Sequence, residues 1–255
     1  MALDEALLDE AAAGRSPPTV RCFTWQSPCI TLGRFQSAAD LDLRRCTAAG
    51  LAVVRRPTGG AAVLHGADLG YAIVLPPRST GAVGGAAGLY QAAGEALAAA
   101  LRSLGLPAET RSGQVGRPAG ACFASLGPCE VVVDGLKVAG SAQLRRRGAV
   151  LQHGSLYPDG GSADIARYLA GSDLPMATSG EAQPSRTPAG EGGEHPLPAL
   201  LARSRAQDLS TQLRLALAGS LGVELVEGTV TAAELERARA LMRARYLAAA
   251  WNLAR

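Results

Sequence analysis

The sequence predicts an α+β fold, in which a mixed or antiparallel sheet packs against helices. Two observations support this fold class. Strand-like and helix-like segments follow one another along the 255 residues without the regular alternation of a parallel α/β fold. Residues 130–143 also have the pattern of an antiparallel hairpin, because the turn pair Asp134-Gly135 separates two apolar runs.

The first part of the chain predicts one helix followed by several strands. Residues 1–13 have apolar positions at helical spacing, and Gly14 ends the helix. The helix over 38–50 is predicted in the same way and closes at Gly50. Alternating or apolar runs predict strands over 19–25, 28–33, 51–56, 61–65 and 69–75, the last two as neighbours.

The second part predicts the main buried helix over the alanine-rich residues 84–105. A strand follows the hairpin over 149–157, and two amphipathic helices over 199–222 and 231–255 enclose a short strand at 223–228. Residues 172–198 are rich in Pro, Gly and Ser, which is typical of a flexible linker or long loop. The expected division is therefore a core over 1–171, a linker over 172–198 and a C-terminal helical segment over 199–255 that packs on the core.

Composition and charge narrow the range of partners. A net charge of +3 without blocks of like charge argues against nucleic acid and leaves a small anion as a candidate ligand. No run of about 18 uninterrupted apolar residues is present, so we expect no membrane association. The acidic N-terminal residues do not fit a signal peptide, and the five cysteines lack metal-site spacing. We expect a cytoplasmic protein with reduced thiols and no metal.

Lys137 is the only lysine, since 24 of the 25 basic residues are arginine (25 − 1 = 24). One interpretation is a leftover lysine on a solvated hairpin, which composition alone favours. The other is a site that needs a compact ammonium, because a guanidinium is broad and keeps its proton whereas the pKa of lysine moves on burial.

Two stretches combine polar side chains with small residues. In "RRPTGGAAVLHG", Arg55 and Arg56 precede a turn whose glycines let the backbone approach a ligand and leave amides free for an anion. Surface arginines on a hairpin turn would give the same pattern. In "KVAGSAQ", the small residues 140–142 leave room along the strand, and His153 with Gly154 on the next strand can face the same side.

Cys122 lies in a loop rich in Gly and Pro, where a thiol is accessible. A nearby cation would lower its pKa and make it a nucleophile at neutral pH. The alternative is an inert buried thiol, which is the usual fate of free cysteine. We give that interpretation to the other four cysteines, Cys22, Cys29, Cys46 and Cys129.

Six segments, in this order, resemble the lipoate–protein ligase A / octanoyltransferase / biotin ligase catalytic family: "ALDEALL", "LGRFQ", "RRPTGGAAVLH", "ACFASLGPCEVVVDGLKVAGSAQ", "LQHGSLY" and "RYLAAAWN". The resemblance covers nearly the whole chain except the linker. It implies a core over 1–171 similar to the catalytic core of biotin protein ligase and class II tRNA synthetases. The cysteine loop before the lysine hairpin is most similar to one branch of the octanoyltransferases.

The resemblance implies an acyltransferase that carries an octanoyl or lipoyl group as a cysteine thioester. Cys122 would be the nucleophile, and Lys137 would stabilise the thiolate and the oxyanion. The implied substrate-binding residues are Arg55, Arg56, Thr58, Gly59, Gly60, His65, Gly140, Ser141, Ala142, His153 and Gly154. The implied donor is acyl carrier protein or acylated glycine cleavage H protein, and the acceptor is a lipoyl-domain protein. This reaction in lipoate biosynthesis or protein lipoylation needs no cofactor.

Two alternatives stay open. An ATP-dependent lipoate–protein ligase would make lipoyl-adenylate with ATP and Mg, with "RRPTGG" and Lys137 around the adenylate and Cys122 incidental. A non-catalytic acyl-binding protein would only keep the fold. The cysteine loop and the lack of a clear accessory domain favour the transferase over the ligase. The presence of both a nucleophile and a lysine argues against the non-catalytic protein.

Overall fold

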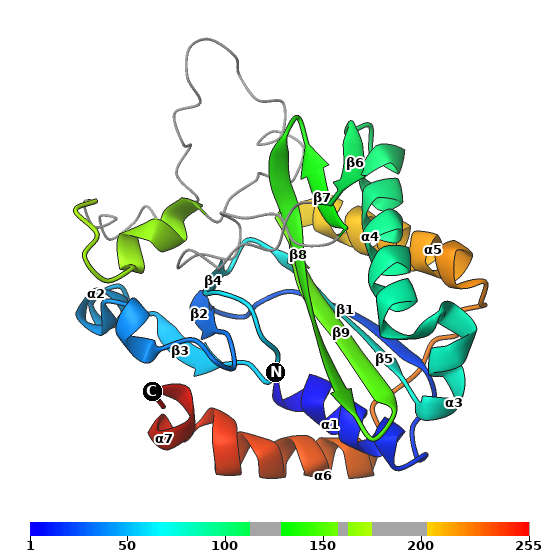
Figure 1. The fold of residues 1–255 in the computed structure, drawn as a ribbon, viewed down its shortest axis with the longest axis horizontal. Helices are drawn as coiled ribbons and strands as arrows, with labels where there is room; N and C mark the ends of the chain where they lie inside the picture. Colours follow the sequence, from blue (N-terminus) through cyan, green and yellow to red (C-terminus); the bar gives the residue numbers. More distant parts are fainter. Residues whose placement is uncertain (113–128, 158–162, 175–202, 255) are drawn as a thin grey trace.

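The computed structural model describes residues 1–112, 129–157, 163–174 and 203–254 (Figure 1). A six-stranded sheet and a three-stranded sheet lie next to each other, with helices packed against them. The predicted α+β class is therefore confirmed. Within the described ranges, no helix combines the length and the apolar character needed to cross a membrane.

The larger sheet is antiparallel throughout, with the strand order β1-β5-β9-β8-β7-β6. The strands are β1 (Thr19–Phe23), β5 (Leu69–Leu75), β6 (Ala108–Arg111), β7 (Glu130–Val133), β8 (Leu136–Arg146) and β9 (Ala149–Leu156). Asp134 and Gly135 join β7 to β8 with φ of 49° and 80°. Two consecutive residues with positive φ are typical of the turn that the Asp-Gly pair predicts.

The smaller sheet has the order β3-β2-β4, with β2 parallel to β3 and antiparallel to β4. Its strands are β2 (Cys29–Leu32), β3 (Ala52–Arg55) and β4 (Val63–His65). The prediction that residues 61–65 and 69–75 form neighbouring strands is wrong, because β4 and β5 belong to different sheets. Asp68 fixes the connection by accepting hydrogen bonds from the Gly66 amide at 2.9 Å and contacting His65 Nδ1 at 2.7 Å.

Helices cover both faces of the larger sheet (Figure 1). The α-helices are α1 (Ala2–Ala12), α2 (Leu43–Ala48), α3 (Pro77–Thr80), α4 (Gly85–Ser103), α5 (Arg203–Leu221), α6 (Ala232–Leu241) and α7 (Ala249–Asn252). Short helical turns are η1 (Ala38–Asp40), η2 (Gly81–Val83), η4 (Ala163–Tyr168) and the π-helical turn η6 (Met242–Tyr246).

Three predicted elements differ from the structure. The single helix expected over 231–255 is divided into α6, η6 and α7, because the backbone at Ala248 is extended. The single helix expected over 38–50 is divided into η1 and α2, because Asp42 accepts hydrogen bonds from the Arg44 and Arg45 amides and starts a new helix there. The strand expected at 223–228 is absent. Residues 223–230 are exposed and irregular, and no neighbouring strand in the described chain pairs with them.

The main core lies between the larger sheet, α4 and α5. Leu209, Leu213 and Leu217 repeat every four residues along α5 and are fully buried with the leucines of α4. On the opposite face, α1 packs on β5 and β9, and α6 packs on α1. The C-terminal helices thus contribute to the packing around the sheet, while the division at 171 and 198 stays a prediction.

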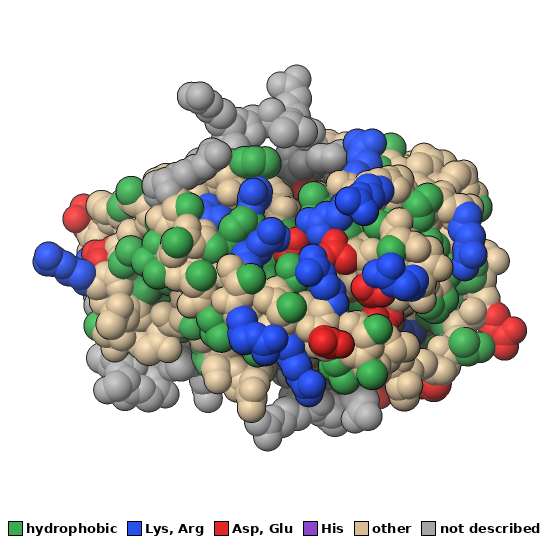
Figure 2. All heavy atoms as spheres, turned by 90° about the horizontal axis from the view of Figure 1, so that it is seen from below, with side chains coloured by type: hydrophobic (Ala, Val, Ile, Leu, Met, Phe, Trp, Pro, Cys, Tyr) green, Lys and Arg blue, Asp and Glu red, His purple; other side chains and the backbone are tan. Residues whose placement is uncertain are grey.

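The outer face formed by α1 and α6 carries charges of both signs (Figure 2). Arg237 pairs with Asp9 at 2.6 Å, and Arg15 pairs with Glu10 at the same distance. Arginine and carboxylate side chains are therefore interspersed on this surface. Such a mixture favours solubility more than attraction of a long polyanion.

Candidate active site

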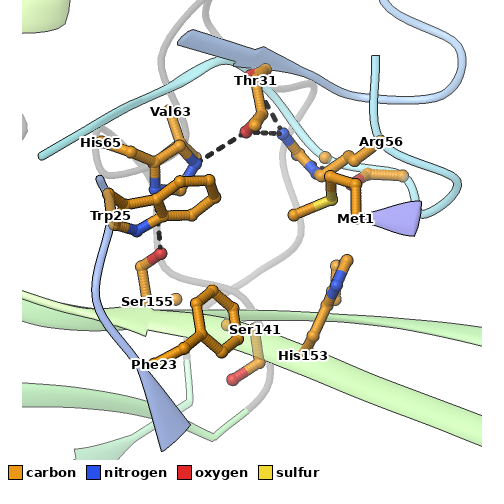
Figure 3. Close-up of a pocket in the computed structure, with 15 residues that line it drawn as sticks. Met1, Phe23, Trp25, Thr31, Arg56, Val63, His65, Ser141, His153 and Ser155 are labelled. Atoms are coloured by element: carbon orange, nitrogen blue, oxygen red, sulfur yellow. Dashed lines mark hydrogen bonds between the residues drawn. The ribbon is translucent and has the colours of Figure 1, made fainter. Parts of the chain in front are cut away.

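A pocket lies between the smaller sheet and the β8–β9 region of the larger sheet (Figure 3). Nine of the eleven predicted substrate-binding residues line it: Arg56, Gly59, Gly60, His65, Gly140, Ser141, Ala142, His153 and Gly154. The other lining residues are Met1, Phe23, Trp25, Thr31, Val63 and Ser155. Arg55 and Thr58, the two remaining predicted residues, do not line the pocket.

Strand register explains why residues far apart in sequence meet here. Phe23 is paired with Gly70, Gly70 with Ser155, and Ser155 with Gly140, so these four residues form one row across four strands. A Cβ on Gly70 would come within 2.4 Å of the Phe23 ring. The absence of a side chain at Gly70 therefore lets the Phe23 ring lie over β5 at the edge of the pocket.

The floor of the pocket is backbone rather than bulky side chains. A Cβ on Gly154 would lie 2.3 Å from the carbonyl oxygen of Gly140 and 2.7 Å from the Tyr71 ring. The Tyr71 hydroxyl in turn hydrogen-bonds to Ser141 Oγ beneath the floor. Gly154 therefore has no room for a side chain on the face of the sheet that carries Tyr71. On the pocket face, Gly140 and Ala142 lie opposite Ser155 and His153 and leave space along β8.

An aromatic wall, formed by Phe23, Trp25 and His65, bounds one side of the pocket (Figure 3). The indole of Trp25 stacks on the imidazole of His65 with centroids 4.0 Å apart, and Phe23 meets Trp25 edge-on at 5.7 Å. Trp25 Nε1 donates to Asp68 Oδ2 at 2.9 Å. Phe23, Trp25 and Asp68 are not among the residues predicted from the sequence, although tryptophan is rare in this chain, which has two.

His65 is held at both ring nitrogens. Its Nδ1 lies 2.7 Å from Asp68 Oδ2, and its Nε2 lies 2.9 Å from the hydroxyl of Thr31. Burial lowers the pKa of His65. Burial acts to raise the pKa of Asp68, but hydrogen bonds from His65, Ser155 and the Gly66 amide oppose this effect, and the pKa stays below its ordinary value. The pair therefore favours a neutral imidazole that donates from Nδ1 to a charged carboxylate.

His153 repeats this arrangement on β9. Its Nε2 lies 2.7 Å from Thr58 Oγ1, and its Nδ1 lies 3.5 Å from Asp4 Oδ2. Burial lowers the pKa of His153 as well. Thr58, though outside the lining, therefore supports a lining residue and ties the "RRPTGG" turn to the larger sheet.

The two arginines of the turn point in different directions, as neighbouring residues at the end of a strand do. Arg56 braces the turn from the pocket side, because its guanidinium donates to Gly59 O at 2.8 Å, Ala61 O at 2.8 Å and Thr31 O at 3.2 Å. Arg55 points away from the pocket toward the C-terminal residues.

Lys137 is 8% exposed, so the interpretation as a leftover lysine on a solvated hairpin is wrong. Its Nζ lies 3.0 Å from Oε1 of Glu130 across the β7–β8 hairpin. Lys137 precedes the pocket-lining residues of β8 by three positions and is not itself in the lining. Cys122, the predicted nucleophile, lies outside the described residues.

The four described cysteines have the character of inert thiols. Burial raises the pKa of Cys22, Cys46 and Cys129, and raises that of Cys29 to about 12. A thiol with a raised pKa carries little thiolate at neutral pH and is a poor nucleophile. In the portion of the chain that the structure describes, no three His, Cys, Asp or Glu side chains group as metal ligands would.

Comparisons with known proteins agree with this architecture. Residues 1–187 match the lipoyl protein ligase A/B catalytic domain. Octanoyltransferase LipM of Kyrpidia tusciae is 37% identical, over 99% of this chain and 93% of its own length. Octanoyltransferase LipM of Symbiobacterium thermophilum is 34% identical over the same shares.

Solved structures share the fold at lower sequence identity. Lipoate-protein ligase A bound with ATP has a TM-score of 0.70 and 22% identity, covering 99% of this chain and 92% of the other. The bipartite lipoate protein ligase of Thermoplasma acidophilum has a TM-score of 0.65 and 21% identity, with the same coverage. From the match over residues 1–187 and the two full-length relatives, this chain belongs to the lipoyl protein ligase A/B catalytic domain family.

Proposed function

We propose that this chain is an octanoyltransferase, which transfers an octanoyl group to a lysine of a lipoyl-domain protein during protein lipoylation. The relatives named octanoyltransferase LipM, which align over nearly the whole chain, support this activity. The structural observation that carries the proposal is the pocket itself. It joins an aromatic wall to a floor of glycine backbone, a surface suited to a flexible fatty acyl chain.

The acyl chain would lie against Phe23, Trp25 and Val63, with its methylenes over Gly140 and Gly154. Removing one methylene from water contributes about 0.8 kcal/mol, so an octanoyl chain can supply most of its own binding energy. The polar lining residues are engaged within the protein. His65 contacts Thr31, which also lines the pocket, and His153 contacts Thr58, which lies outside the lining. They shape the pocket wall, and the guanidinium of Arg56, which also lines the pocket, donates to backbone carbonyls of the turn.

Transfer proceeds in two thioester steps, with Cys122 as the proposed nucleophile. In the first step its thiolate attacks the carbonyl carbon of the donor thioester, an acyl–enzyme thioester forms, and the donor thiol leaves with a proton. In the second step the neutral lysine amine of the acceptor attacks that carbonyl, an amide forms, and the Cys122 thiol is released. No cofactor enters either step, since the acyl group is already activated as a thioester.

Lys137 is the proposed oxyanion donor in both steps. Its chain position supports this role, because Cys122 lies eight positions before Glu130, the ion-pair partner of Lys137. A compact ammonium held in a buried site stabilises negative charge more strongly than one in water. As donor we propose acyl carrier protein or acylated glycine cleavage H protein.

The turn geometry favours this reaction over ATP-dependent ligation. An adenylate would call for cationic donors directed at phosphate. The guanidinium of Arg56 instead donates to three backbone carbonyls of the turn and its neighbour β2, and that of Arg55 points away from the pocket. Both arginines of "RRPTGG" thus act within the protein framework.

Intact mass spectrometry tests the proposal. The purified chain is incubated with octanoyl acyl carrier protein without ATP, and we expect a gain of one octanoyl group. Cys122→Ser should lose the adduct, whereas Cys129→Ser, which removes a thiol of raised pKa, should keep it. A lipoyl domain added afterwards should accept the group.

A parallel mixture contains lipoate, ATP and Mg with the same lipoyl domain. Modification in this mixture alone, unaffected by Cys122→Ser, would replace the transferase with a ligase. An octanoyl chain that binds but is transferred in neither mixture would identify a non-catalytic acyl-binding protein.

A further inference from the structure

Arg55 joins segments that lie far apart in the sequence. Its side chain is 2% exposed, and its guanidinium donates to backbone carbonyls on two sides. On one side Nη1 reaches Gly33 O at 2.8 Å and Gln36 O at 2.5 Å. On the other side Nη2 reaches Asn252 O at 3.2 Å and Ala254 O at 2.6 Å. One buried cation therefore holds the 33–36 loop and the C-terminal residues together.

The C-terminal residues also bind the main chain of β3. Asn252 Oδ1 accepts a hydrogen bond from the Arg55 amide at 3.0 Å, and Trp251 Nε1 donates to Arg55 O at 2.9 Å. Asn252 Nδ2 donates to Tyr246 O at 2.8 Å, which fixes the amide side chain. We call Arg55, Trp251, Asn252 and Ala254 the C-terminal clasp.

The 33–36 loop connects the C-terminal clasp to the pocket. The Arg34 amide donates to Thr58 O at 2.8 Å. Gly33 packs so closely on the glycine turn that a Cβ would lie 1.7 Å from Gly60 O. Gly60 lines the pocket. An uninterrupted series of direct contacts thus runs from the C-terminal residues through Arg55 and the loop to the pocket wall.

We infer that Arg55 is a positioning residue, which couples the C-terminal segment 246–254 to the pocket, and that this segment sets how tightly the pocket holds the acyl chain. The inference rests on the proposed function, because it concerns affinity for the same acyl group. Arg55 and the clasp act on the wall and not on the reacting carbonyl. Their loss should therefore weaken binding of the acyl donor while leaving turnover of the bound donor intact.

The chemistry of guanidinium explains why arginine occupies this position. Its five N–H donors in a rigid plane reach two groups of carbonyls at once, from the loop and from the C-terminal residues. An ammonium in Arg55→Lys keeps the charge but is a point donor with three hydrogens. The ammonium can reach either the carbonyls of the 33–36 loop or those of the C-terminal residues. The carbonyls that it does not reach lose the hydrogen bonds that Arg55 donates, which costs free energy because they are buried.

Two variants of the full-length chain test the coupling: Arg55→Lys and Asn252→Ala. Calorimetric titration with an octyl-pantetheine thioether, which binds but cannot transfer an acyl group, gives Kd. Steady-state transfer from octanoyl carrier protein gives KM and kcat. We expect Kd and KM to rise about tenfold, within the range of coupled sites. We expect kcat to stay within about twofold of the wild-type value, as for an interaction lost equally from ground and transition states.

Arg45→Ala is the matched control. The Arg45 guanidinium also donates to two distant backbone carbonyls, Arg167 O at 3.1 Å and Leu174 O at 2.6 Å, but these partners lie outside the pocket lining. We expect this variant to melt at a lower temperature and to keep the wild-type Kd. Circular dichroism melting of each variant corrects Kd for any unfolded fraction. Trp251→Phe, which removes one hydrogen bond, serves as a milder variant with a smaller rise in Kd should Arg55→Lys fail to fold.

The possible outcomes separate the two ideas. Wild-type Kd and KM in folded Asn252→Ala, or an equal loss of affinity in Arg45→Ala, would overturn the coupling and leave the proposed function in place. A wild-type chain that neither binds the octyl thioether nor accepts an octanoyl group would refute the proposed function, and the coupling with it.

Discussion

The ammonium of Lys137 lies 3.0 Å from a carboxylate oxygen of Glu130, and both side chains are more than nine-tenths buried. The two residues face each other across the β7–β8 hairpin, where a register shift between Val131 and Val132 interrupts regular pairing. A buried pair of this kind has lost the solvation of both charges, so each partner depends on the other. The proposed oxyanion donor is thus held in place by a fixed counter-charge.

Replacing one residue of this pair should destabilise the fold far more than replacing both residues together. We expect Lys137→Met and Glu130→Leu each to lower the free energy of unfolding by about 3–5 kcal/mol, because each removes the ion-pair partner of a buried charge. The double variant should regain most of that loss. Urea unfolding of the wild type, the two single variants and the double variant completes a double-mutant cycle. If the loss in the double variant equals the sum of the two single losses, the two residues do not depend on each other and the prediction is wrong. Both variants without Lys137 should be inactive in transfer.

The aromatic wall should determine the acyl chain length. Phe23→Ala removes a ring from the edge of the pocket, so we expect the preferred donor to shift from octanoyl toward longer chains. Each additional methylene that the enlarged pocket buries contributes about 0.8 kcal/mol. Competition between carrier proteins with chains of different length measures the shift. An unchanged preference would show that another part of the pocket limits the chain.

Gly70→Ala tests the contact between β5 and the Phe23 ring of the aromatic wall. Its new Cβ would meet the Phe23 ring at 2.4 Å, so we expect a loss of about 1–3 kcal/mol in stability from overpacking. Combining it with Phe23→Ala should remove the clash and restore much of the loss. Thermal melting of the single and double variants checks this, and equal destabilisation with or without the ring would disprove the proposed contact.

Stability should fall as the pH drops below neutrality because of two histidines. Burial lowers the pKa of His65 and of His153 below the ordinary value of 6.5. Near pH 6.5 the histidines of the unfolded chain therefore take up protons, whereas those of the folded chain stay neutral. The contribution of the neutral histidines to the free energy of unfolding is fully present above pH 6.5 and decreases as the pH falls. Each histidine contributes a slope of up to about 1.4 kcal/mol per pH unit below 6.5.

The charged groups around the two histidine rings do not reverse the direction of this pH dependence. Asp68 and Asp4 have pKa values lowered from 3.8, so both carboxylates stay charged between pH 7.5 and 5.5 in the folded and the unfolded chain. Arg56 remains cationic throughout and disfavours a second positive charge on either ring. Urea midpoints at pH 7.5 and 5.5 measure the effect, and His65→Gln should reduce the slope. A midpoint independent of pH would refute the role of burial.

Thiol reactivity should single out Cys122. Burial raises the pKa of the other four cysteines, so iodoacetamide at pH 7 should alkylate them slowly in the folded chain. We expect Cys122 to react first, and prior incubation with octanoyl carrier protein to protect it. Peptide mass spectrometry over time gives the order. Early labelling of Cys129, which directly precedes β7, would contradict this assignment.

Features encoded within a few residues could be predicted from the sequence. The Asp134-Gly135 turn follows from the need for positive φ at two positions, and the small residues of β8 and β9 follow from their spacing. The pairing of β8 with β9 places Ala142 opposite His153, so both residues face the same side of the sheet, as expected from the sequence. Local chemistry was sufficient because hairpin strands pair with their nearest neighbours in sequence.

Features that depend on distant segments could not be predicted in this way. Arg55 and Asn252 are separated by 197 positions, and no local pattern reveals that this arginine serves the C-terminal residues and not the pocket. Phe23 and Trp25 resemble ordinary core residues until strand register places Phe23 opposite Gly70. The mistaken pairing of β4 with β5 has the same origin, because the partner of β4 is β2, about thirty-five positions earlier.

The position of Trp25, stacked on His65 in the pocket lining, makes it an intrinsic fluorescent reporter of ligand binding. The chain has two tryptophans, and Trp25 lines the pocket whereas Trp251 lies in the C-terminal clasp. An apolar chain that displaces water from Trp25 should shift indole emission to shorter wavelength. In a Trp251→Phe background the remaining fluorescence would follow occupation of the pocket in real time, without any added label.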